Sequence, residues 1–507
     1  MSVERIKKIL ILGDSMAAWM TAAALIKTMP ADLCSISILG SEDATKSTSQ
    51  YLGVHPAGLK FHRFLGLNEN ELLKKTHGVF SFGERYQNYH KNGENYFVPY
   101  GRYGTELDAI AFHHHWLADT AAGGKTALGE YSLAECAALS GKFMRPENMG
   151  NSPVSQLIYG LHLDAGEYIT FLKELSLANG VKKISDKVVN AGFRENGLIS
   201  HIVTEKNGNI HADLFLDCSD KVSALFGLIT ETEREDWSSL FSGNSSITTK
   251  KQSSNPAQPS KNIQALSSSI ALPGGRVDAV ELADGWRYRA VTCKEKDKGT
   301  LLLKNVYPEI AFDKELVEDE IKPGKYNRAW IKNCVAIGKT FCELNGDTKI
   351  EHYLIQSAIF RLLSLFPDNE FRQPDIDEYN VQVNLDVQQV TNFLALPLYL
   401  SEWPDGGMWK KESRIHTDAE LADKISAFKS AGRLYKKNNE LFDESAWLSI
   451  FAGHHVKPHG WHQLATTMND RVRESKLSGI RSVIQQSLKH MPTHYEYLMQ
   501  NIHGGQQ

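Results

Sequence analysis

The feature that most constrains the fold is an apolar run that passes through a glycine turn into a second apolar run. Ile9–Leu12 is typical of a buried strand, Gly13 begins a tight turn, and a helical pattern starts at Met16. This order is the opening of a dinucleotide-binding βαβ unit. In the G-x-G-x-x-G fingerprint, Ser15 stands at the second glycine and Ala18 at the third, where alanine is acceptable. The opening therefore predicts the fold more strongly than the cofactor.

The second strand of this unit carries a similar departure. A helix over Met16–Lys27 and a strand over Ser35–Gly40 are expected to follow the turn. In dinucleotide-binding folds, an acidic residue near the end of this strand binds the adenosine ribose. Here Gly40 and Ser41 stand at that point, and Glu42 comes two positions late. The sequence keeps the scaffold and weakens the nucleotide contacts.

Periodicity and capping residues place further elements along the chain. Asp164 is expected to cap an amphipathic helix, and Thr348-x-x-Glu351 has capping-box spacing at the start of a helix that ends near Leu365. The stretch 242–269, rich in Ser, Asn and Lys, is expected to be a flexible loop insertion. From residue 374 onward the pattern is mainly helical. Further strands are expected at Val79–Tyr86, Val188–Phe193, Ile199–Thr204, Ala212–Ser219 and Cys334–Gly338.

Charge and cysteine content narrow the class of protein. A net charge of -4 gives no argument for nucleic acid or an anionic membrane as a partner, and no apolar stretch is long enough to span a membrane. The 6 cysteines are widely spaced and form no CxxC motif, which is typical of reduced thiols in a cytoplasmic protein. The N-terminal residues lead straight into a strand, so no signal peptide is expected.

Four motifs in order along the chain resemble those of flavin-dependent tryptophan halogenases: Gly160–Ala165, Ala212–Ser219, Asn327–Gly338 and Ile450–Gly453. The resemblance implies an α/β, FAD-binding, Rossmann-like flavoprotein monooxygenase fold. It further implies an FAD-binding module with a substrate-side sheet over 1–370, and a mainly helical subdomain over 371–507 that packs on the substrate pocket. Reduced FAD from a separate flavin reductase, oxygen and an aromatic small-molecule or peptide substrate follow from the same resemblance. So does a homodimer, and a paralogue is the expected partner if the chain is non-catalytic.

The chain departs from this family at the positions that carry halogenation. In the family, a Lys after Gly-x-Phe and a Glu in a Glu-Pro-Leu-Glu-Ser-Thr loop direct the oxidised halide onto an aromatic ring. The resemblance places Ser81 at the Lys position and Thr348 at the Glu position, with Glu351 as a helix cap or a displaced acid. Asp347 lies where the halide is expected. Asp220 replaces a glycine beside the flavin, and its charge repels a pyrophosphate if it points inward.

The remaining candidate positions come from the same resemblance. Trp286 and Tyr288 share one face of a strand, so that they either line a tunnel or pack in the core. The run His113–His115 is expected to be structural because adjacent histidines on a helix diverge, and no metal site is predicted. The expected cofactor contacts are Gly13, Ser15, Ala18, Trp19, Val188, Asp217, Gly338 and Ile350. The expected substrate contacts, which are alternatively core residues, are Trp286, Tyr288, His454, His455 and Trp461.

Three functions remain open on these residues. The first is flavin-dependent oxidation of an aromatic substrate with altered chemistry. The second is a non-catalytic homologue that serves as a binding or assembly partner of an active paralogue. The third is true halogenation with substitute residues, which requires other groups to act in place of the Lys and Glu. Binding of FAD separates the first from the second, and a brominated product separates the first from the third.

Overall fold

The computed structural model describes residues 5–504 except 31, 41–49, 149, 151, 221–224, 230–232, 254, 256–257, 294–295, 309–315, 405–407, 410–417 and 438–439. The chain forms two compact units, each assembled from three segments. Unit 1 comprises Met1–Thr76, Leu163–Ser238 and Glu320–Gln388, and unit 2 comprises His77–His162, Ser239–Asp319 and Gln389–Gln507. The boundary expected between residues 370 and 371 falls inside unit 1, which continues to Gln388 within the helix Gln373–Leu400.

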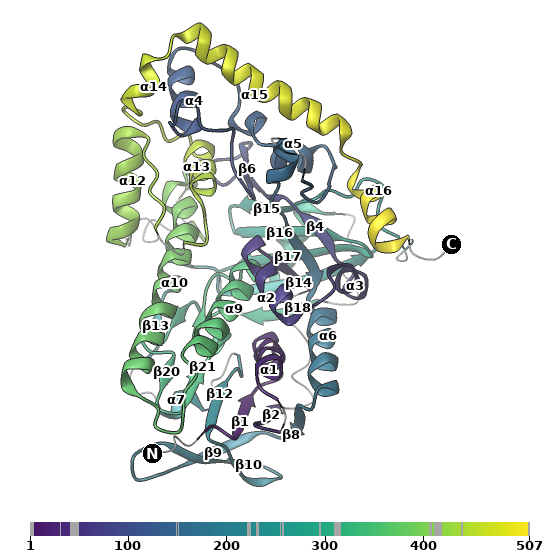
Figure 1. The fold of residues 1–507 in the computed structure, drawn as a ribbon, viewed down its shortest axis with the longest axis vertical. Helices are drawn as coiled ribbons and strands as arrows, with labels where there is room; N and C mark the ends of the chain where they lie inside the picture. Colours follow the sequence, from purple (N-terminus) through teal and green to yellow (C-terminus); the bar gives the residue numbers. More distant parts are fainter. Residues whose placement is uncertain are drawn as a thin grey trace. The chain divides into compact units, whose positions relative to one another are not determined.

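Unit 1 is built on a six-stranded sheet with the order β20-β21-β12-β1-β2-β8. All neighbours are parallel except β20 and β21, and the strands β1 and β12 are almost entirely buried apolar runs, as a covered parallel sheet requires. The helix α1 follows β1 as predicted and contacts α6 and α9 (Figure 1). The bounds are β1 Lys8–Leu12, α1 Met16–Thr28, β2 Ser35–Gly40, α6 Ala165–Ala178, β8 Lys182–Ser185, β12 Leu214–Asp217, β20 Trp330–Ile331, β21 Cys334–Ala336 and α9 Thr348–Ser364.

Smaller elements complete unit 1. The strands β9, β10 and β11 form an antiparallel sheet, as do β13, β19 and β22. Asp164 caps α6 as expected, because its Oδ1 accepts the N–H groups of Gly166 and Glu167 at 3.0 and 3.1 Å. The bounds are β3 Tyr51–Val54, η2 Pro56–Gly58, α2 Leu59–Leu65, α3 Glu69–Lys75, β9 Val188–Phe193, β10 Ile199–Thr204, β11 Gly208–His211, α7 Phe226–Ile229, β13 Glu235–Asp236, β19 Gly324–Lys325, η5 Gly338–Thr340 and β22 Cys342–Glu343.

Unit 2 contains a seven-stranded sheet with the order β18-β14-β17-β16-β15-β5-β6. The prediction of a loop over 242–269 is wrong, because β14 and the start of β15 lie in this stretch. Ile247, Thr248 and Thr249 are buried in β14, and their β-branched side chains suit a strand despite the polar composition. The bounds are β4 Val79–Ser81, β5 Gly83–Gln87, β6 Asn95–Pro99, β7 Gly160–Asp164, β14 Ser245–Gln252, β15 Ser267–Leu272, β16 Gly275–Leu282, β17 Gly285–Thr292 and β18 Val317–Glu320.

The C-terminal part of unit 2 is mainly helical, as predicted. Its core includes the stacked rings of Phe428 and Phe451, together with Trp447 and Tyr131. The helix α10 (Gln373–Leu400) contributes residues to both units. The other bounds are α4 Phe112–Ala121, η3 Leu128–Tyr131, α5 Leu133–Leu139, η4 Pro153–Gln156, α8 Lys296–Val306, α12 Ala419–Ala431, α13 Glu444–Gly453, α14 Gln463–Thr467, α15 Asp470–His490, α16 His494–Leu498 and η6 Met499–His503.

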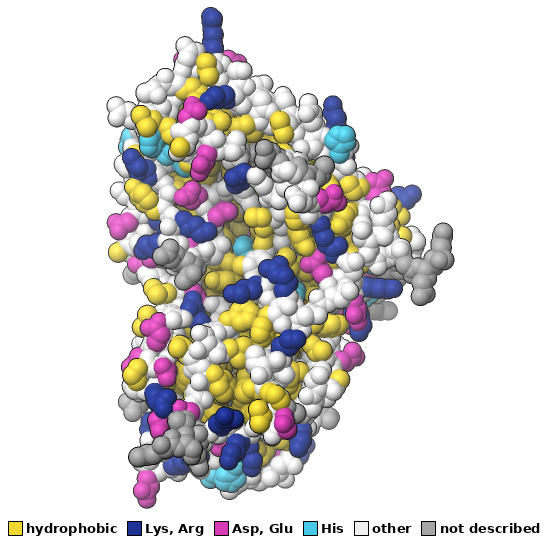
Figure 2. All heavy atoms as spheres, viewed as in Figure 1, with side chains coloured by type: hydrophobic (Ala, Val, Ile, Leu, Met, Phe, Trp, Pro, Cys, Tyr) yellow, Lys and Arg dark blue, Asp and Glu magenta, His cyan; other side chains and the backbone are white. Residues whose placement is uncertain are grey.

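The surface carries both signs of charge. On the face shown in Figure 2, Lys and Arg side chains lie among Asp and Glu side chains. This mixture agrees with the small net charge of -4. Among the residues that the structure describes, no helix is long and apolar enough to cross a membrane.

Candidate functional site

The turn between β1 and α1 keeps the geometry of a nucleotide-binding turn. Gly13 has φ +105°, and a Cβ atom there would lie 2.4 Å from the carbonyl oxygen of Cys218, so only glycine fits. Ser15 is the N-cap of α1: its Oγ accepts the N–H of Ala18 at 3.3 Å and donates to the oxygen of Cys218 at 2.8 Å. The serine therefore preserves the turn, but it takes one of the helix N-terminal donors that a phosphate would use.

Next to this turn lies a buried ion pair that sequence reasoning missed. The side chain of Asp14 is 0% exposed, and its carboxylate accepts from Lys183 Nζ at 2.7 Å and from Trp19 Nε1 at 2.6 Å. The positive charge of Lys183 thus compensates the negative charge of Asp14 close to the start of α1. Trp19, an expected cofactor contact, is fully buried, as is Ala18. Because the lysine comes from β8, far along the chain, no local sequence pattern predicts the pair.

The loop after β12 is organised by Asp217, which is fully buried. Its Oδ2 accepts the backbone N–H groups of Leu225 and Phe226 at 2.9 and 2.8 Å, so this expected cofactor contact acts first as an anchor of its own loop. Asp220 has φ +69°, a left-handed conformation that glycine adopts more easily. Its backbone N–H donates to Thr340 Oγ1 at 3.2 Å. The replacement of the family's glycine at this point therefore carries a backbone cost.

Three further expected cofactor contacts lie in unit 1. Gly338 has φ +72°, and a Cβ atom there would lie 2.8 Å from the Cβ of Ala17, which makes glycine necessary for the approach of η5 to α1. Ile350 is buried in the first turn of α9, and Val188 is half-buried at the start of β9. The structure gives these last two positions an apolar packing role.

The N-terminus of α9 is occupied by the carboxylate of Asp347. Its Oδ1 accepts the N–H of Lys349 at 2.9 Å and that of Ile350 at 3.4 Å. The expected capping box of Thr348 and Glu351 is wrong, because the preceding aspartate is the N-cap. Thr348 is buried, and its Oγ1 instead accepts the N–H of Gly53 at 3.0 Å. The carboxylate of Asp347 therefore takes the place at this helix end that a bound anion would take.

Glu351 lies in a group of charges that sequence reasoning found only in part. Lys339 Nζ is 3.9 Å from an oxygen of Glu351 and 3.8 Å from an oxygen of Glu343. Burial raises the pKa of Glu343, and the charge of Lys339 opposes this shift only in part. Lys339 directly follows Gly338, and a lysine between two carboxyl groups can hold or move a proton.

Ser81, the expected counterpart of the family's Lys, has a structural role in unit 2. It is fully buried at the end of β4, where its Oγ donates to the carbonyl of Gly83 at 3.1 Å and accepts its N–H at 3.3 Å. These bonds close the bend between β4 and β5. The hydroxyl is thus committed to the backbone.

The expected substrate residues of unit 2 are dispersed. Trp286 and Tyr288 stack with ring centroids 5.8 Å apart, and Tyr288 is buried in the core that α8 covers, which favours the core alternative. His454 is buried, and desolvation lowers its pKa to about 3. Trp461 is half-buried. In the histidine run, one ring nitrogen of each residue bonds a different backbone group: that of Gly432 for His113, of His462 for His114 and of Leu107 for His115.

A cavity of about 540 Å³ lies in unit 2, and of the expected substrate residues only His455 lines it. Glu135, which the sequence did not single out, lies in its wall and accepts from the hydroxyl of Tyr103 at 3.4 Å. Burial raises the pKa of Glu135 to about 7. The walls are mostly aromatic and apolar, which suits a planar apolar ring. They include Tyr96, Phe97, Tyr103, Trp116, Leu117, Leu128 and Phe428.

The βαβ opening, the parallel sheet and the glycine turns of unit 1 define an α/β fold of the dinucleotide-binding type. The family model described as tryptophan halogenase matches residues 8–470. The chain belongs to the tryptophan halogenase family, and the resemblance drawn from its motifs is confirmed.

Individual relatives agree with this assignment. The tryptophan 6-halogenase ThaL of Streptomyces albogriseolus is 22% identical over 543 residues, covering 99% of each chain. Among solved structures, BrvH, a flavin-dependent halogenase from Brevundimonas sp. BAL3, is 26% identical with a TM-score of 0.89, over 98% of this chain and 99% of its own. Xcc4156, a flavin-dependent halogenase from Xanthomonas campestris, is 26% identical with a TM-score of 0.90, over 98% of both chains.

The family implies FAD as cofactor, with the reduced form supplied by a separate reductase. The residues of unit 1 fit this group. Gly13 and Gly338 keep the turns close, the N-terminus of α1 offers backbone donors, and Lys183 compensates the charge of Asp14. Reduced FAD, when bound, would supply electrons for redox chemistry.

Proposed function

We propose that this chain is a flavin-dependent oxidoreductase that uses reduced FAD and oxygen to oxidise an aromatic substrate, tryptophan-like or peptide-borne, without halogenating it. The observation that carries the proposal is the N-terminus of α9. In the family, the halide is expected at this point, and here the carboxylate of Asp347 binds the N–H groups of Lys349 and Ile350. A halide ion would have to displace a covalently attached anion.

The two positions expected to direct the halogen also support oxidation without halogenation. Ser81 is committed to the backbone of Gly83, and Thr348 to the backbone of Gly53. Neither side chain carries a cation that could hold an oxidised halide or a carboxylate that could take up a proton. We assign proton handling in unit 1 to Lys339, with Glu343 and Glu351, because the three charges lie together beside a glycine turn of the cofactor scaffold.

The proposal extends to location and partners. A separate flavin reductase supplies reduced FAD, and the protein acts in the cytoplasm, consistent with its cysteine usage. A tryptophan-like ring, free or in a peptide, suits the aromatic cavity of unit 2, where the carboxyl of Glu135 offers a polar contact.

The test begins with titration of oxidised and reduced FAD, followed by absorbance and flavin fluorescence. The protein is then incubated with a flavin reductase, oxygen and a panel of tryptophan derivatives and peptides, with and without bromide, and BrvH serves as the halogenating control. We expect that the protein binds flavin and that the products gain oxygen both with and without bromide. A brominated product would contradict the proposal in favour of a true halogenase. Absence of binding by both redox forms would favour a non-catalytic assembly partner, for which the donor consumed by Ser15 is the structural argument.

A further inference from the structure

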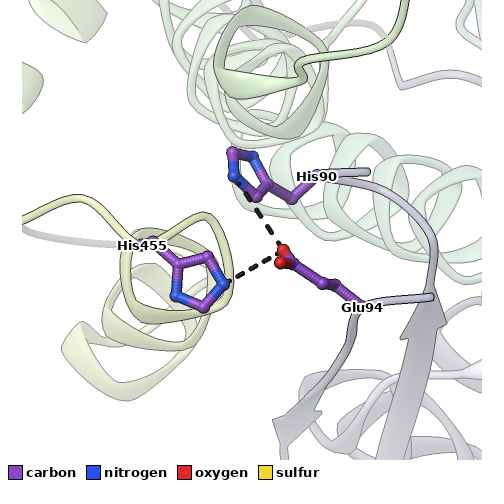
Figure 3. Close-up of side chains that lie close together, drawn as sticks. All are labelled: His90, Glu94 and His455. Carbon is purple, nitrogen blue, oxygen red and sulfur yellow. Dashed lines mark hydrogen bonds and ion pairs between the residues drawn. The ribbon is translucent and has the colours of Figure 1, made fainter. Parts of the chain in front are cut away.

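We propose that unit 2 binds a divalent transition-metal ion through His90, Glu94 and His455. One ligand atom from each of these residues lies within 4.8 Å of the other two. Figure 3 shows both imidazole rings directed toward the carboxylate. Two imidazoles and one carboxylate form a common ligand set for Zn²⁺, Co²⁺ and Fe²⁺. The site lies in unit 2, whereas the scaffold expected to hold FAD lies in unit 1.

The turn between β5 and β6 brings His90 and Glu94 together. Asn88, with φ +63°, starts the turn, and its N–H donates to the carbonyl of Glu94 at 2.6 Å. Its side-chain Oδ1 accepts the N–H of Gly93 at 2.8 Å. These bonds close the turn on itself, so the two ligands are fixed on one side of it before any ion binds.

The third ligand comes from the C-terminal end of α13. His455 has φ +53°, an uncommon conformation for a residue with a side chain, and its N–H donates to the carbonyl of Ala452 at 3.0 Å. A Cβ atom at Gly453 would lie 2.3 Å from the ring of Tyr96, so glycine permits the close approach of this helix end to β6. The result places His455 Nε2 3.0 Å from Glu94 Oε2.

The distances between the ligand atoms match an ion better than a set of hydrogen bonds. Around a tetrahedral Zn²⁺, with bonds of about 2.05 Å, neighbouring ligand atoms lie about 3.3 Å apart. The observed separations from Glu94 Oε2 are 3.0 Å to His455 Nε2 and 3.9 Å to His90 Nε2, one on each side of that value. The longer one exceeds hydrogen-bonding distance. His90 is buried.

A fourth ligand lies beside the set. Glu402 Oε2 is 3.7 Å from His90 Nε2, and the backbone N–H of Glu402 donates to the carbonyl of His90 at 2.9 Å, which holds the two residues together. Lys91 lies 3.1 Å from the other carboxylate oxygen of Glu94, Oε1, so Oε2 is the oxygen available to an ion. Neutral imidazoles select transition metals over Ca²⁺ and Mg²⁺, which prefer oxygen ligands.

The location gives the ion a consequence for the cavity of unit 2. Glu94 and His455 both line that cavity. A bound ion would tie the β5–β6 turn to the end of α13 and fix this part of the wall.

The first experiment is a Co²⁺ titration of the full metal-free chain, followed by the visible absorption of four-coordinate cobalt. We expect one equivalent to bind. His455→Ala and Glu94→Gln should each weaken binding by more than about 100-fold, the upper end of the loss for an outer-shell partner. His455 is 59% exposed, so its replacement leaves the fold intact. His459→Ala, an exposed histidine of the same unit outside the set, is the matched control and should bind as the unmodified protein does.

The second readout is the unfolding temperature with and without Zn²⁺. A rise that is present in the unmodified chain and in His459→Ala, and absent in His455→Ala, supports the site. Cobalt binding of equal affinity in His455→Ala and Glu94→Gln, or no stoichiometric binding at high micromolar Co²⁺, overturns it. FAD titration of the same variants should be unchanged, which keeps this test separate from that of the proposed function.

Discussion

Replacement of Asp347 tests directly whether the N-terminus of α9 has lost its anion site. Asp347→Ala removes a cap that binds the N–H groups of Lys349 and Ile350 at 2.9 and 3.4 Å. Loss of an N-cap costs about 1 kcal/mol, and loss of a negative charge at a helix N-terminus costs about 0.3–1 kcal/mol. We therefore expect the free energy of unfolding to fall by about 1–2 kcal/mol. For a unit of this size, this fall lowers the unfolding temperature by about 2–8 °C.

The same variant should regain affinity for halide. With the carboxylate removed, the two N–H groups and the nearby Lys349 ammonium present donors and positive charge to an anion. A bromide concentration ten times the dissociation constant would restore about 1.4 kcal/mol. Asp347→Asn is the matched control: asparagine caps as well as aspartate, so it should lose only the charge contribution and stay insensitive to bromide.

The assay is thermal unfolding of the three proteins in sodium bromide and in sodium gluconate at equal ionic strength. The expected pattern is a bromide-specific rise for Asp347→Ala and none for the unmodified chain or for Asp347→Asn. An equal bromide-specific rise in the unmodified chain would refute the reasoning, because the helix end would then accept halide despite the carboxylate. An unchanged unfolding temperature in Asp347→Ala would show that the cap contributes nothing.

Three further outcomes are expected in units 1 and 2. Lys183→Met leaves Asp14 as a buried unpaired charge, so it should destabilise the protein by about 3–5 kcal/mol and weaken FAD binding, and adding Asp14→Asn should recover most of the stability in urea unfolding. Ser15→Gly frees the N–H of Ala18 for a phosphate, so FAD titration should show binding about fivefold tighter at a helix cost of a few tenths of a kcal/mol. Glu135 has its pKa raised from 4.5 to about 7, so it contributes stability that is present below pH 4.5 and is lost as the pH rises to about 7. Glu135→Gln should remove this dependence on pH. Its free energy of unfolding, measured with urea across pH, should exceed that of the unmodified chain by about 3 kcal/mol above pH 7 and should equal it at pH 4.

Local patterns in the sequence predicted the elements that depend on neighbouring residues. The turn at Gly13 and the strand Ser35–Gly40 occur at the expected positions, and the cap at Asp164 forms as its spacing indicates. These features depend on backbone conformation, side-chain period and short-range hydrogen bonds, all of which can be derived from a few consecutive residues.

The features that were missed depend on partners from distant segments. The strand β14 carries a loop-like composition, and it is a strand because β17 pairs with it along its whole length. The charge on Asp14 is compensated by Lys183 from another strand of the sheet, and His90 meets His455 only after the helical region packs on the β5–β6 turn. One sequence shows each of these residues singly, and tertiary structure decides which of them meet.

The division of each unit into three segments has a consequence for synthesis. In unit 1, β1 lies inside the sheet between β2 and β12, so its second edge stays unpaired until β12, beginning at Leu214, has left the ribosome. At about 5–20 residues per second, β1 has one unpaired edge for roughly 10–40 s. Its unpaired edge and apolar faces are a target for chaperones or aggregation during that interval. Slowed translation and truncation upstream of β12 should therefore reduce the soluble yield of this protein more than that of a protein with sequential domains.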